Sequence, residues 1–320
     1  MPTDRSYLLA LDFGGTKHSA ALLPLDGKEW LARDRVQMPR GSDAHQDQQT
    51  MEGMACRLVD AWPGRIAAIG VSFGGPVDFE SGTVKLSHHV PGWEDIPLAL
   101  RLADRFGART VVDNDANAAA LGEWRFGAGQ GSESLLYVTV STGIGGGWVL
   151  GSHVYRGSDG MAGEIGHMVV HPEGAPCDCG KKGCLEAEAC GLAIARKALH
   201  RLAESRCASS LREKCGGDLA RITAAMVAEA AQENDLFSCR LIAEAAEFLG
   251  QGLAFAVNLM NPNCIVLGGG VTKAGPEYWK TIRQSVESRI LPQMRADIRP
   301  AALGDDAPLW GAAALAQKIL

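Results

Sequence analysis

Three short glycine-rich turns, each directly after an apolar segment, constrain the fold of this chain more than any other feature of its sequence. The turns are Gly14-Gly15 after residues 8–11, Ser141 to Gly147 after residues 135–140, and Gly268 to Gly270 after residues 264–267. Glycine accounts for 39 of the 320 residues, above its usual share of about 7%. One glycine turn between strands is common as a simple bend. Three of them favour a nucleotide-binding role, because consecutive exposed N–H groups in such turns form concavities that bind anions.

The first two turns lie in matching strand–turn–strand segments. These segments align with Asp12 over Ser141 and Gly14 over Gly143, which indicates a weak internal duplication in which each copy opens a domain. Apolar strand-like segments alternate with segments of helical spacing, and this alternation predicts an α/β fold. The expected strands are 8–11, 19–23, 66–73, 110–112, 135–140, 148–150 and 264–267, and the expected helices are 98–106, 185–203, 222–259 and 310–320, with a polar break over 205–218.

Net charge and hydropathy exclude several classes of protein. Lys and Arg number 31 against 37 Asp and Glu, a net charge of −6, so a nucleic-acid-binding surface over the whole protein is not expected. No stretch of the sequence approaches the roughly 18 consecutive apolar residues of a membrane helix. Asp12 also ends the apolar run 7–11 before it could serve as the core of a signal peptide. The nine cysteines are too few for a disulfide scaffold, and a soluble cytoplasmic protein is expected.

The segment Asp12 to Lys17 places a carboxylate at a strand end. The turn that follows contains two glycines, which leave its backbone accessible. In this turn Thr16 can donate a hydroxyl, Lys17 adds positive charge, and Asp12 can hold a hydrated Mg²⁺ ion. We expect Gly14 and its counterpart Gly143 to need positive φ and to allow the close approach of phosphate. Neither G-x-x-x-x-G-K-[ST] nor G-x-G-x-x-G occurs in the sequence, so the two most familiar phosphate-binding motifs are excluded.

The strand near Val112 is followed by Asp113 to Asn117 and then three alanines, which favour a helix. Asp115 or Asn114 can simply be the N-cap of that helix, since Asp and Asn are preferred there. Alternatively, a carboxylate at this strand-to-helix junction lies beside the phosphate turns and accepts the proton of an attacking hydroxyl. The residues alone leave both interpretations open.

The most specific local signal is His167 followed by three cysteines in the spacing H-x9-C-x-C-x4-C. Cys177, Cys179 and Cys184 together with His167 fit a closed tetrahedral zinc site, in which four protein ligands leave no open position and the metal is structural. The spacing disfavours the alternative of four reduced side chains in an ordinary loop. His171 is a further candidate for the fourth ligand. The other cysteines are expected in cores or on helix faces.

Two glutamates lie beside the cysteine loop in the sequence. Glu164 precedes His167 by three residues, and Glu186 follows Cys184 by two. Glutamates in such positions are usually solvated surface charges. Next to rigidly held metal ligands, they also suit hydrogen bonding to a polyol.

Taken in order, these pieces resemble the ROK family of sugar kinases and sugar-sensing repressors over nearly the whole chain. The matching motifs are Asp12 to Lys17 as the first phosphate motif, Ser141 to Gly147 as the second, Ile265 to Val271 as the adenosine-side motif, and Gly166-His167 with Cys177 to Glu186 as the zinc and substrate signature. The stretches most similar to the ATP-dependent glucokinase branch are Pro91-Gly92-Trp93, Asn114 to Glu123, Tyr155-Arg156-Gly157 and Gly163 to His167. The chain departs from the pattern at His88-His89, where such members often carry Pro-Asn, and at Ser141, which replaces a frequent glycine.

The resemblance implies the actin-like ATPase fold, with two α/β domains and a cleft between them. The small domain would comprise residues 1–114 plus 302–320, and the large domain would comprise residues 115–301 with the zinc loop. The implied substrates are ATP and a hexose, most often glucose, and the implied metals are Mg²⁺ and a structural Zn²⁺. The resemblance also implies a homo-oligomer, either a dimer or a tetramer. It implies no nucleic-acid partner and no membrane partner.

Residue roles follow from the same resemblance. Asp115 is implied as the general base, which takes the proton of the sugar's 6-hydroxyl as that hydroxyl attacks the γ-phosphorus in line. The implied sugar-binding residues are Gly75, Asn114, Asp115, Glu164, His167 and Glu186. The implied nucleotide-binding residues are Asp12, Gly14, Gly15, Thr16, Lys17, Thr142, Gly143, Gly268, Gly269 and Gly270. The implied zinc ligands are His167, Cys177, Cys179 and Cys184.

Other functions are compatible with the same motifs. A kinase for fructose, mannose or N-acetylmannosamine would share them. A sugar-responsive repressor would need a DNA-binding module ahead of the first strand, and only six residues precede Tyr7, so we do not expect one. A zinc-stabilised sugar-binding protein without catalysis is disfavoured, because Asp115 occurs together with both phosphate turns.

Overall fold

The computed structural model describes residues 5–39, 41–87, 90–205 and 207–320. Within these, the chain forms two compact units. Unit 1 comprises Met1–Tyr137, Gly147–Ala162 and Ala301–Leu320, and unit 2 comprises Val138–Gly146 and Gly163–Pro300. The domain boundary expected after residue 114 falls inside unit 1, at the junction between a strand and a helix.

The first sheet has five strands in the order β3-β2-β1-β4-β7. They are β1 (Ser6–Phe13), β2 (Lys17–Pro24), β3 (Ala32–Gln37), β4 (Arg65–Phe73) and β7 (Arg109–Asn114). β1 runs antiparallel to β2 and parallel to β4, and β4 runs parallel to β7. The register therefore places Asp12, Ser72 and Asp113 side by side at the carboxyl ends of three parallel strands.

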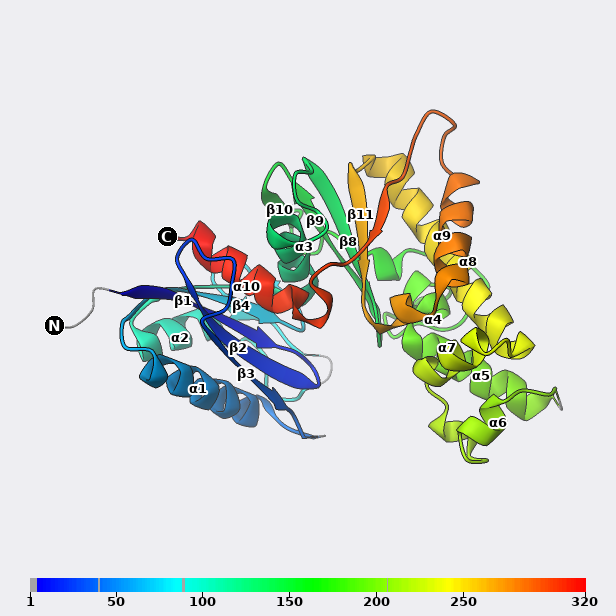
Figure 1. Cartoon of the computed structure of the whole chain (residues 1–320), viewed down its shortest axis with the longest axis horizontal. Coiled ribbons are helices and arrows are strands. Elements are labelled where there is room, and N and C mark those ends of the chain that lie inside the picture. The colour runs from blue at the N-terminus through cyan, green and yellow to red at the C-terminus, as the bar shows by residue number, and fades with distance from the viewer. Residues whose placement is uncertain (1–4, 40, 88–89, 206) are drawn as a thin grey trace. The chain divides into compact units, whose positions relative to one another are not determined.

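Helices cover both faces of this sheet (Figure 1). α1 (Ala44–Ala61) and α2 (Leu98–Phe106) share a hydrophobic core with Leu9, whereas α10 (Ala307–Lys318) shares a second core with Leu8. Successive residues of β1 thus serve opposite cores, because side chains alternate across a strand. A short hairpin of β5 (Val77–Asp78) and β6 (Thr83–Val84) lies between β4 and α2 in the sequence.

Glycine allows α10 to approach its neighbours closely. A Cβ on Gly311 would lie 1.8 Å from the carbonyl oxygen of Ala118 on α3 (Asp115–Phe126), and a Cβ on Gly70 of β4 would lie 1.8 Å from the carbonyl oxygen of Ala312. No side chain fits at such distances. The packing of α10 on α3 and β4 therefore requires glycine at both positions.

The second sheet repeats the pattern of the first. Its five strands have the order β10-β9-β8-β11-β12. They are β8 (Ser134–Val140), β9 (Ile144–Leu150), β10 (His153–Tyr155), β11 (Cys264–Gly268) and β12 (Ile298–Pro300). In each sheet, three consecutive strands are followed on the other side by two later ones, and the last pair is parallel. This common order supports the internal duplication predicted from the two glycine turns.

Unit 2 carries most of the remaining helices. They are α4 (Leu185–Ala189), α5 (Gly191–Glu204), α6 (Leu211–Lys214), α7 (Ala224–Gln232), α8 (Leu236–Met260) and α9 (Pro276–Glu287). Short 3₁₀ turns are η1 (Ile165–His167), η2 (Leu219–Arg221) and η3 (Gly270–Lys273) here, and η4 (Gly304–Asp306) in unit 1. α8 and α9 pack closely, and a Cβ on Gly250 would lie 2.4 Å from the Cβ of Ser285.

The helices of residues 185–260 are interrupted at positions that the sequence did not predict. The helix expected over 185–203 is interrupted at Cys190, which has an extended backbone and whose sulfur accepts the N–H of Ala193 at the start of α5. The helix expected over 222–259 is divided before Asp235, whose side chain caps α8. The expected polar break over 205–218 contains α6. Helices α1 and α9 and strand β3 were not predicted.

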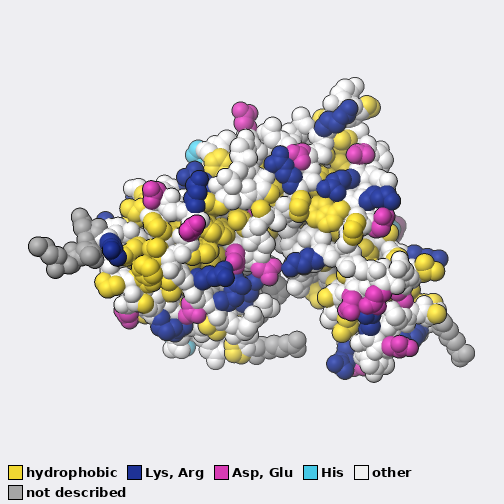
Figure 2. Space-filling model, in the orientation of Figure 1, with side chains coloured by type: hydrophobic (Ala, Val, Ile, Leu, Met, Phe, Trp, Pro, Cys, Tyr) yellow, Lys and Arg dark blue, Asp and Glu magenta, His cyan; other side chains and the backbone are white. Residues whose placement is uncertain are grey.

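Helix length and surface charge are two further features of the described residues. Among those residues, no helix combines the length and the apolar character needed to cross a bilayer. On the face shown in Figure 2, Lys and Arg side chains are scattered among Asp and Glu.

Candidate active site

The carboxyl ends of β1 and β4 bring two buried polar side chains together. Oδ1 of Asp12 accepts a hydrogen bond of 2.9 Å from the hydroxyl of Ser72. Burial raises the pKa of Asp12 to about 7, and the negative charge of Asp115 adds to this, while Ser72, Lys17 and His18 act in the opposite direction. The raised pKa shows that the negative charge of Asp12 is costly at this site, and a cation bound nearby would offset that cost.

The first glycine turn connects β1 to β2. A Cβ on Gly14 would lie 2.8 Å from the carbonyl oxygen of Lys17, so a side chain does not fit in the turn. Neither Gly14 nor Gly143 has a positive φ, and our expectation that both need one was wrong. Close contact, not left-handed conformation, favours glycine at both sites: with the backbone of Lys17 at Gly14, and with the side chain of Glu186 at Gly143. Nζ of Lys17 lies 3.5 Å from the carboxylate of Asp305.

Asn114 and Asp115, the two candidates for the N-cap, both contact the first turn of α3. Asn114 is the N-cap of α3, and its Oδ1 accepts the N–H groups of Ala116 and Asn117 at 2.9 and 3.3 Å. Its Nδ2 donates to the carbonyl of Gly75 at 3.2 Å, so the cap also connects two expected sugar-binding positions. Asp115 is the first residue of α3, and its Oδ1 accepts the Ala116 N–H at 2.8 Å.

The carboxylate of Asp115 lies in the neighbourhood of the first glycine turn. A Cβ on Gly74 would lie 3.7 Å from Oδ2 of Asp115 and 3.9 Å from the backbone nitrogen of Gly15. Asp115 and Gly15 therefore both lie close to Gly74. A base and a phosphate-binding turn in this relation suit proton removal next to a phosphoryl group.

The pair Asp113 and Arg156 was not predicted from the sequence. Nη2 and Nε of Arg156 donate to Oδ2 of Asp113 at 2.5 and 3.1 Å, while Oδ1 accepts the Asn114 N–H at 2.9 Å. Burial raises the pKa of Asp113 against the opposing charge of Arg156. The guanidinium also lies 3.4 Å from the ring centroid of Phe79. The pair holds the strand end that carries Asn114. Its members stand in two stretches noted in the sequence, Asp113 to Asn117 and Tyr155-Arg156-Gly157, but nothing there connected them.

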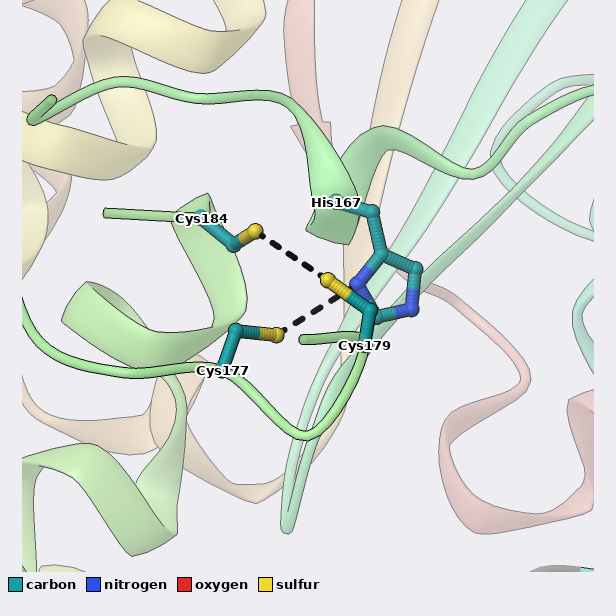
Figure 3. A group of neighbouring side chains, drawn as sticks. All are labelled: His167, Cys177, Cys179 and Cys184. Atoms are coloured by element: carbon teal, nitrogen blue, oxygen red, sulfur yellow. Dashed lines mark hydrogen bonds between the residues drawn. The ribbon is translucent and has the colours of Figure 1, made fainter. Parts of the chain in front are cut away.

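Four side chains in unit 2 form the expected metal cluster (Figure 3). One ligand atom each from His167, Cys177, Cys179 and Cys184 lies within 4.8 Å of the others. The Cys179 and Cys184 sulfurs are 3.6 Å apart, and the Cys177 sulfur lies 3.6 Å from Nδ1 of His167. Two sulfurs at ~2.3 Å from a tetrahedral zinc ion would be about 3.8 Å apart. The residues therefore fit a four-coordinate zinc ion.

His171, the other candidate ligand, has different partners. Its Nδ1 lies 3.4 Å from the carboxylate of Glu188, and its ring stacks on Phe248 with a centroid distance of 5.4 Å. Glu188 also accepts the backbone N–H of Ala175 and the ammonium of Lys197, both at 2.7 Å. These contacts fix the segment before Cys177. The structure thus favours His167 over His171 as the fourth ligand.

The two glutamates beside the cluster have different surroundings. Oε2 of Glu186 accepts the backbone N–H of Ile144 at 2.8 Å, so this carboxylate is not merely solvated. Oε2 of Glu164 lies 3.9 Å from Nε2 of His167, and the Glu164 side chain is about half exposed. Because Nδ1 of His167 faces the sulfurs, Nε2 is the nitrogen on the side of Glu164.

The third glycine turn packs against the second strand–turn–strand segment. Gly269 has a φ of +90°, and a Cβ there would lie 2.3 Å from the carbonyl oxygen of Val140. Both the left-handed backbone and the close approach require glycine. A Cβ on Gly270 would meet no atom within 4 Å. The structure therefore brings the end of β8 and the third turn together within unit 2.

Each unit carries its own share of the predicted site. Unit 1 holds Asp12, Gly14, Gly15, Thr16, Lys17, Gly75, Asn114 and Asp115, and unit 2 holds Thr142, Gly143, Glu164, His167, Glu186, Gly268, Gly269 and Gly270 with the three cysteines. His88 and His89, the departure noted in the sequence, lie outside the described residues.

Known proteins are similar to this chain over nearly its whole length. The sequence profile of the ROK family matches residues 8–319. A glucokinase from Halalkalibacterium halodurans is 38% identical over 97% of this chain and 94% of its own length. The structure of the ROK hexokinase from Thermus thermophilus has a TM-score of 0.84 at 36% identity and covers 98% of each chain. A ROK family glucokinase from Streptomyces griseus, solved with glucose and AMPPNP, has a TM-score of 0.83 at 33% identity and covers 98% of this chain and 99% of its own.

Proposed function

Since this chain belongs to the ROK family, we propose that it is an ATP-dependent sugar kinase that converts glucose to glucose 6-phosphate. Its fold is the actin-like ATPase fold in two α/β units, like that of its structural relatives. The observation that carries the proposal is the position of the Asp115 carboxylate beside the first glycine turn. The names of the related glucokinases and the glucose-bound relative support glucose as the sugar.

The chemistry assigned to Asp115 is that of a general base. Its carboxylate accepts the proton of the sugar's primary hydroxyl while the hydroxyl oxygen bonds to the γ-phosphorus of ATP and the bond to ADP breaks. Asn114, which caps α3 and is tied to Gly75, orients this end of the helix. Phosphoryl transfer needs mainly positioning and charge neutralisation from the protein. A Mg²⁺ ion, held through water by Asp12, would neutralise phosphate charge when bound.

The sugar-binding role falls on polar groups that can read several hydroxyls. Glu164 and Glu186 are acceptors, Asn114 is both donor and acceptor, and Nε2 of His167 is the donor left when Nδ1 faces the metal site. A site built on hydrogen bonds rejects analogues that leave its polar groups unpaired. This is the reason to expect a marked preference among hexoses.

The cluster of His167 with three cysteines is assigned to a structural zinc ion. Four protein ligands complete a tetrahedral shell, so the metal would fix the loop and would not contact the substrate. Its three thiols need a reducing compartment, which favours the cytoplasm. We also expect the protein to form a homo-oligomer, which light scattering coupled to gel filtration would test.

A coupled assay for ADP across glucose, fructose, mannose and N-acetylmannosamine tests the proposed function. We expect the highest kcat/KM with glucose and a product phosphorylated at the primary hydroxyl. If another hexose gave a higher kcat/KM than glucose, that hexose would be assigned as the substrate. Binding of a sugar without ADP formation under any of these conditions would favour a sugar-sensing protein of the same family.

A further inference from the structure

The segment after the metal loop, the loop of residues 177–184 that carries the three cysteines, makes two hydrogen bonds to the second glycine turn. Oε2 of Glu186 accepts the Ile144 N–H at 2.8 Å. Five residues later, the N–H of Gly191 donates to the carbonyl of Ser141 at 2.7 Å. All these residues belong to unit 2. The side-chain contact comes from α4 and the backbone contact from the first residue of α5, and together they hold Ser141 and Ile144, the residues on either side of Thr142-Gly143.

The fit between Glu186 and the turn is tight. A Cβ on Gly143 would lie 2.4 Å from Oε2 of Glu186, so glycine at 143 makes room for this carboxylate. On another side, a Cβ on Gly166 would lie 2.1 Å from the carbonyl oxygen of Ile144. Gly166 precedes the ligand His167 directly. The turn is therefore contacted by Gly166, which is next to His167, and by Glu186, which follows Cys184 by two residues.

We propose that Glu186 is a positioning residue for the nucleotide: its carboxylate fixes the second glycine turn in the conformation that binds phosphate. This inference rests on the proposed kinase function, in which the turn contacts ATP and Glu186 also contacts the sugar. Oε2 is committed to Ile144, and Oε1 is the oxygen that can meet a sugar hydroxyl. One side chain then supports both substrates.

The physical basis is preorganisation of the turn. A loop that is ordered before its ligand arrives does not lose that conformational freedom on binding, so its affinity is higher. Without an acceptor for the Ile144 N–H, the turn would populate other conformations. A hydrogen bond to a charged acceptor is among the stronger ones in a protein. The predicted consequence is a loss of nucleotide affinity even when no sugar is present.

Binding of a non-hydrolysable ATP analogue with Mg²⁺, measured by calorimetry without sugar, tests the proposal. Glu186→Ala should weaken binding about tenfold, the effect of losing one hydrogen bond to a charged group. Glu186→Gln keeps an acceptor at the same reach and should bind within about twofold of the parent. Glu186→Asp keeps the charge but shortens the side chain, and it should resemble the alanine variant.

Glu164→Ala serves as the matched control, because its carboxylate is placed beside His167 and belongs to the sugar-binding set only. It should bind the analogue with the affinity of the parent. Parent affinity in both Glu186→Ala and Glu186→Asp would overturn the proposal, as would a loss in Glu186→Gln equal to that in Glu186→Ala. Hydrogen exchange of the peptide containing Ile144 gives a readout independent of affinity, and it should be faster in the alanine variant.

The outcome can be separated from that of the proposed function by one measurement on the parent. If the parent forms ADP with a hexose and the Glu186 variants bind the analogue normally, the positioning role is wrong and the kinase assignment stands. If the parent forms no ADP and binds no analogue, the kinase assignment itself fails. Unchanged melting temperatures across the variants would establish that the affinity differences do not come from unfolding.

Discussion

The hydroxyl of Ser72 donates a hydrogen bond of 2.9 Å to Oδ1 of Asp12, and both side chains are buried at the carboxyl ends of adjacent parallel strands. A hydrogen bond to the charged form lowers the pKa of a carboxyl group. Burial outweighs it here and raises the pKa of Asp12 to about 7. The fold therefore places a costly charge where the proposed kinase needs an acceptor for a hydrated cation.

This pKa predicts a pH dependence of stability in buffer without nucleotide and Mg²⁺. The folded-state pKa of about 7 exceeds the reference value of 3.8, so the folded protein binds more protons than the unfolded chain between these values. The Asp12 contribution to the free energy of unfolding should fall as pH rises from 4 to 7, by at most about 4 kcal/mol. Asp12→Asn should remove this fall. Chemical denaturation of the parent and the variant at pH 5 and pH 8 measures this effect. If the difference in free energy of unfolding between parent and variant were the same at both pH values, the prediction would be contradicted.

Asp115→Asn should abolish turnover while leaving sugar affinity largely intact. The amide keeps the size of the carboxylate and can still accept the Ala116 N–H, but it cannot take the proton of the attacking hydroxyl. Loss of a general base lowers kcat by about 10² to 10⁴. Steady-state kinetics and sugar titration on the same preparation check both parts. Turnover near that of the parent would leave Asp115 with a structural role at the start of α3 only.

Local patterns predicted the glycine turns, the strands of the first sheet except β3, and the metal cluster, because each lies within a short segment. The choice between His167 and His171 was not decided by spacing, since it depends on Glu188 and Phe248, which lie on later helices. The pair of Asp113 and Arg156 was missed for the same reason: its members are 43 residues apart. Sequence periodicity carries no information on such contacts.

The breaks in the helical part show a second limit. An apolar period of three and four continues through Cys190, where the backbone is extended. Its sulfur caps the next helix, although cysteine is not among the preferred caps. Tertiary contacts of the neighbouring Gly191 with Ser141 decide the break. The positive φ expected at Gly14 and Gly143 was wrong because a tight turn can need glycine for close contact alone.

Arg156→Ala should both destabilise unit 1 and slow catalysis. It would leave the buried carboxylate of Asp113 without its cation, which costs about 3 kcal/mol for a buried pair broken on one side. The strand end that carries Asn114 would lose its support. A double-mutant cycle with Asp113→Asn measures the coupling, and we expect it to exceed about 1 kcal/mol. Additive effects of the two substitutions would show that the pair contributes no mutual stabilisation.

Zinc should be present at about one ion per chain, as a single four-ligand site requires. Cys179→Ser or treatment with a strong chelator should lower the melting temperature and the sugar affinity together, because His167 and both glutamates depend on the loop. Metal analysis, thermal unfolding and sugar titration provide the measurements. Full sugar affinity and an unchanged melting temperature in metal-free protein would show that the loop does not act as the scaffold of the sugar site.

Two glycines in the metal loop offer a matched pair of substitutions. Gly180 and Gly183 both have left-handed backbones, with φ of +85° and +68°, but a Cβ on Gly180 would meet nothing within 4 Å, whereas one on Gly183 would lie 1.5 Å from the carbonyl oxygen of His171. Alanine at either position costs about 1 kcal/mol for its backbone conformation. Only Gly183→Ala must also displace the backbone near Cys184, because a carbonyl oxygen cannot move as a flexible side chain does. We therefore expect Gly180→Ala to retain zinc against a chromogenic chelator as the parent does, and Gly183→Ala to release it at a chelator concentration at least about tenfold lower. Equal retention by the two variants would mean that the contact with His171 does not hold the loop in its ligating shape.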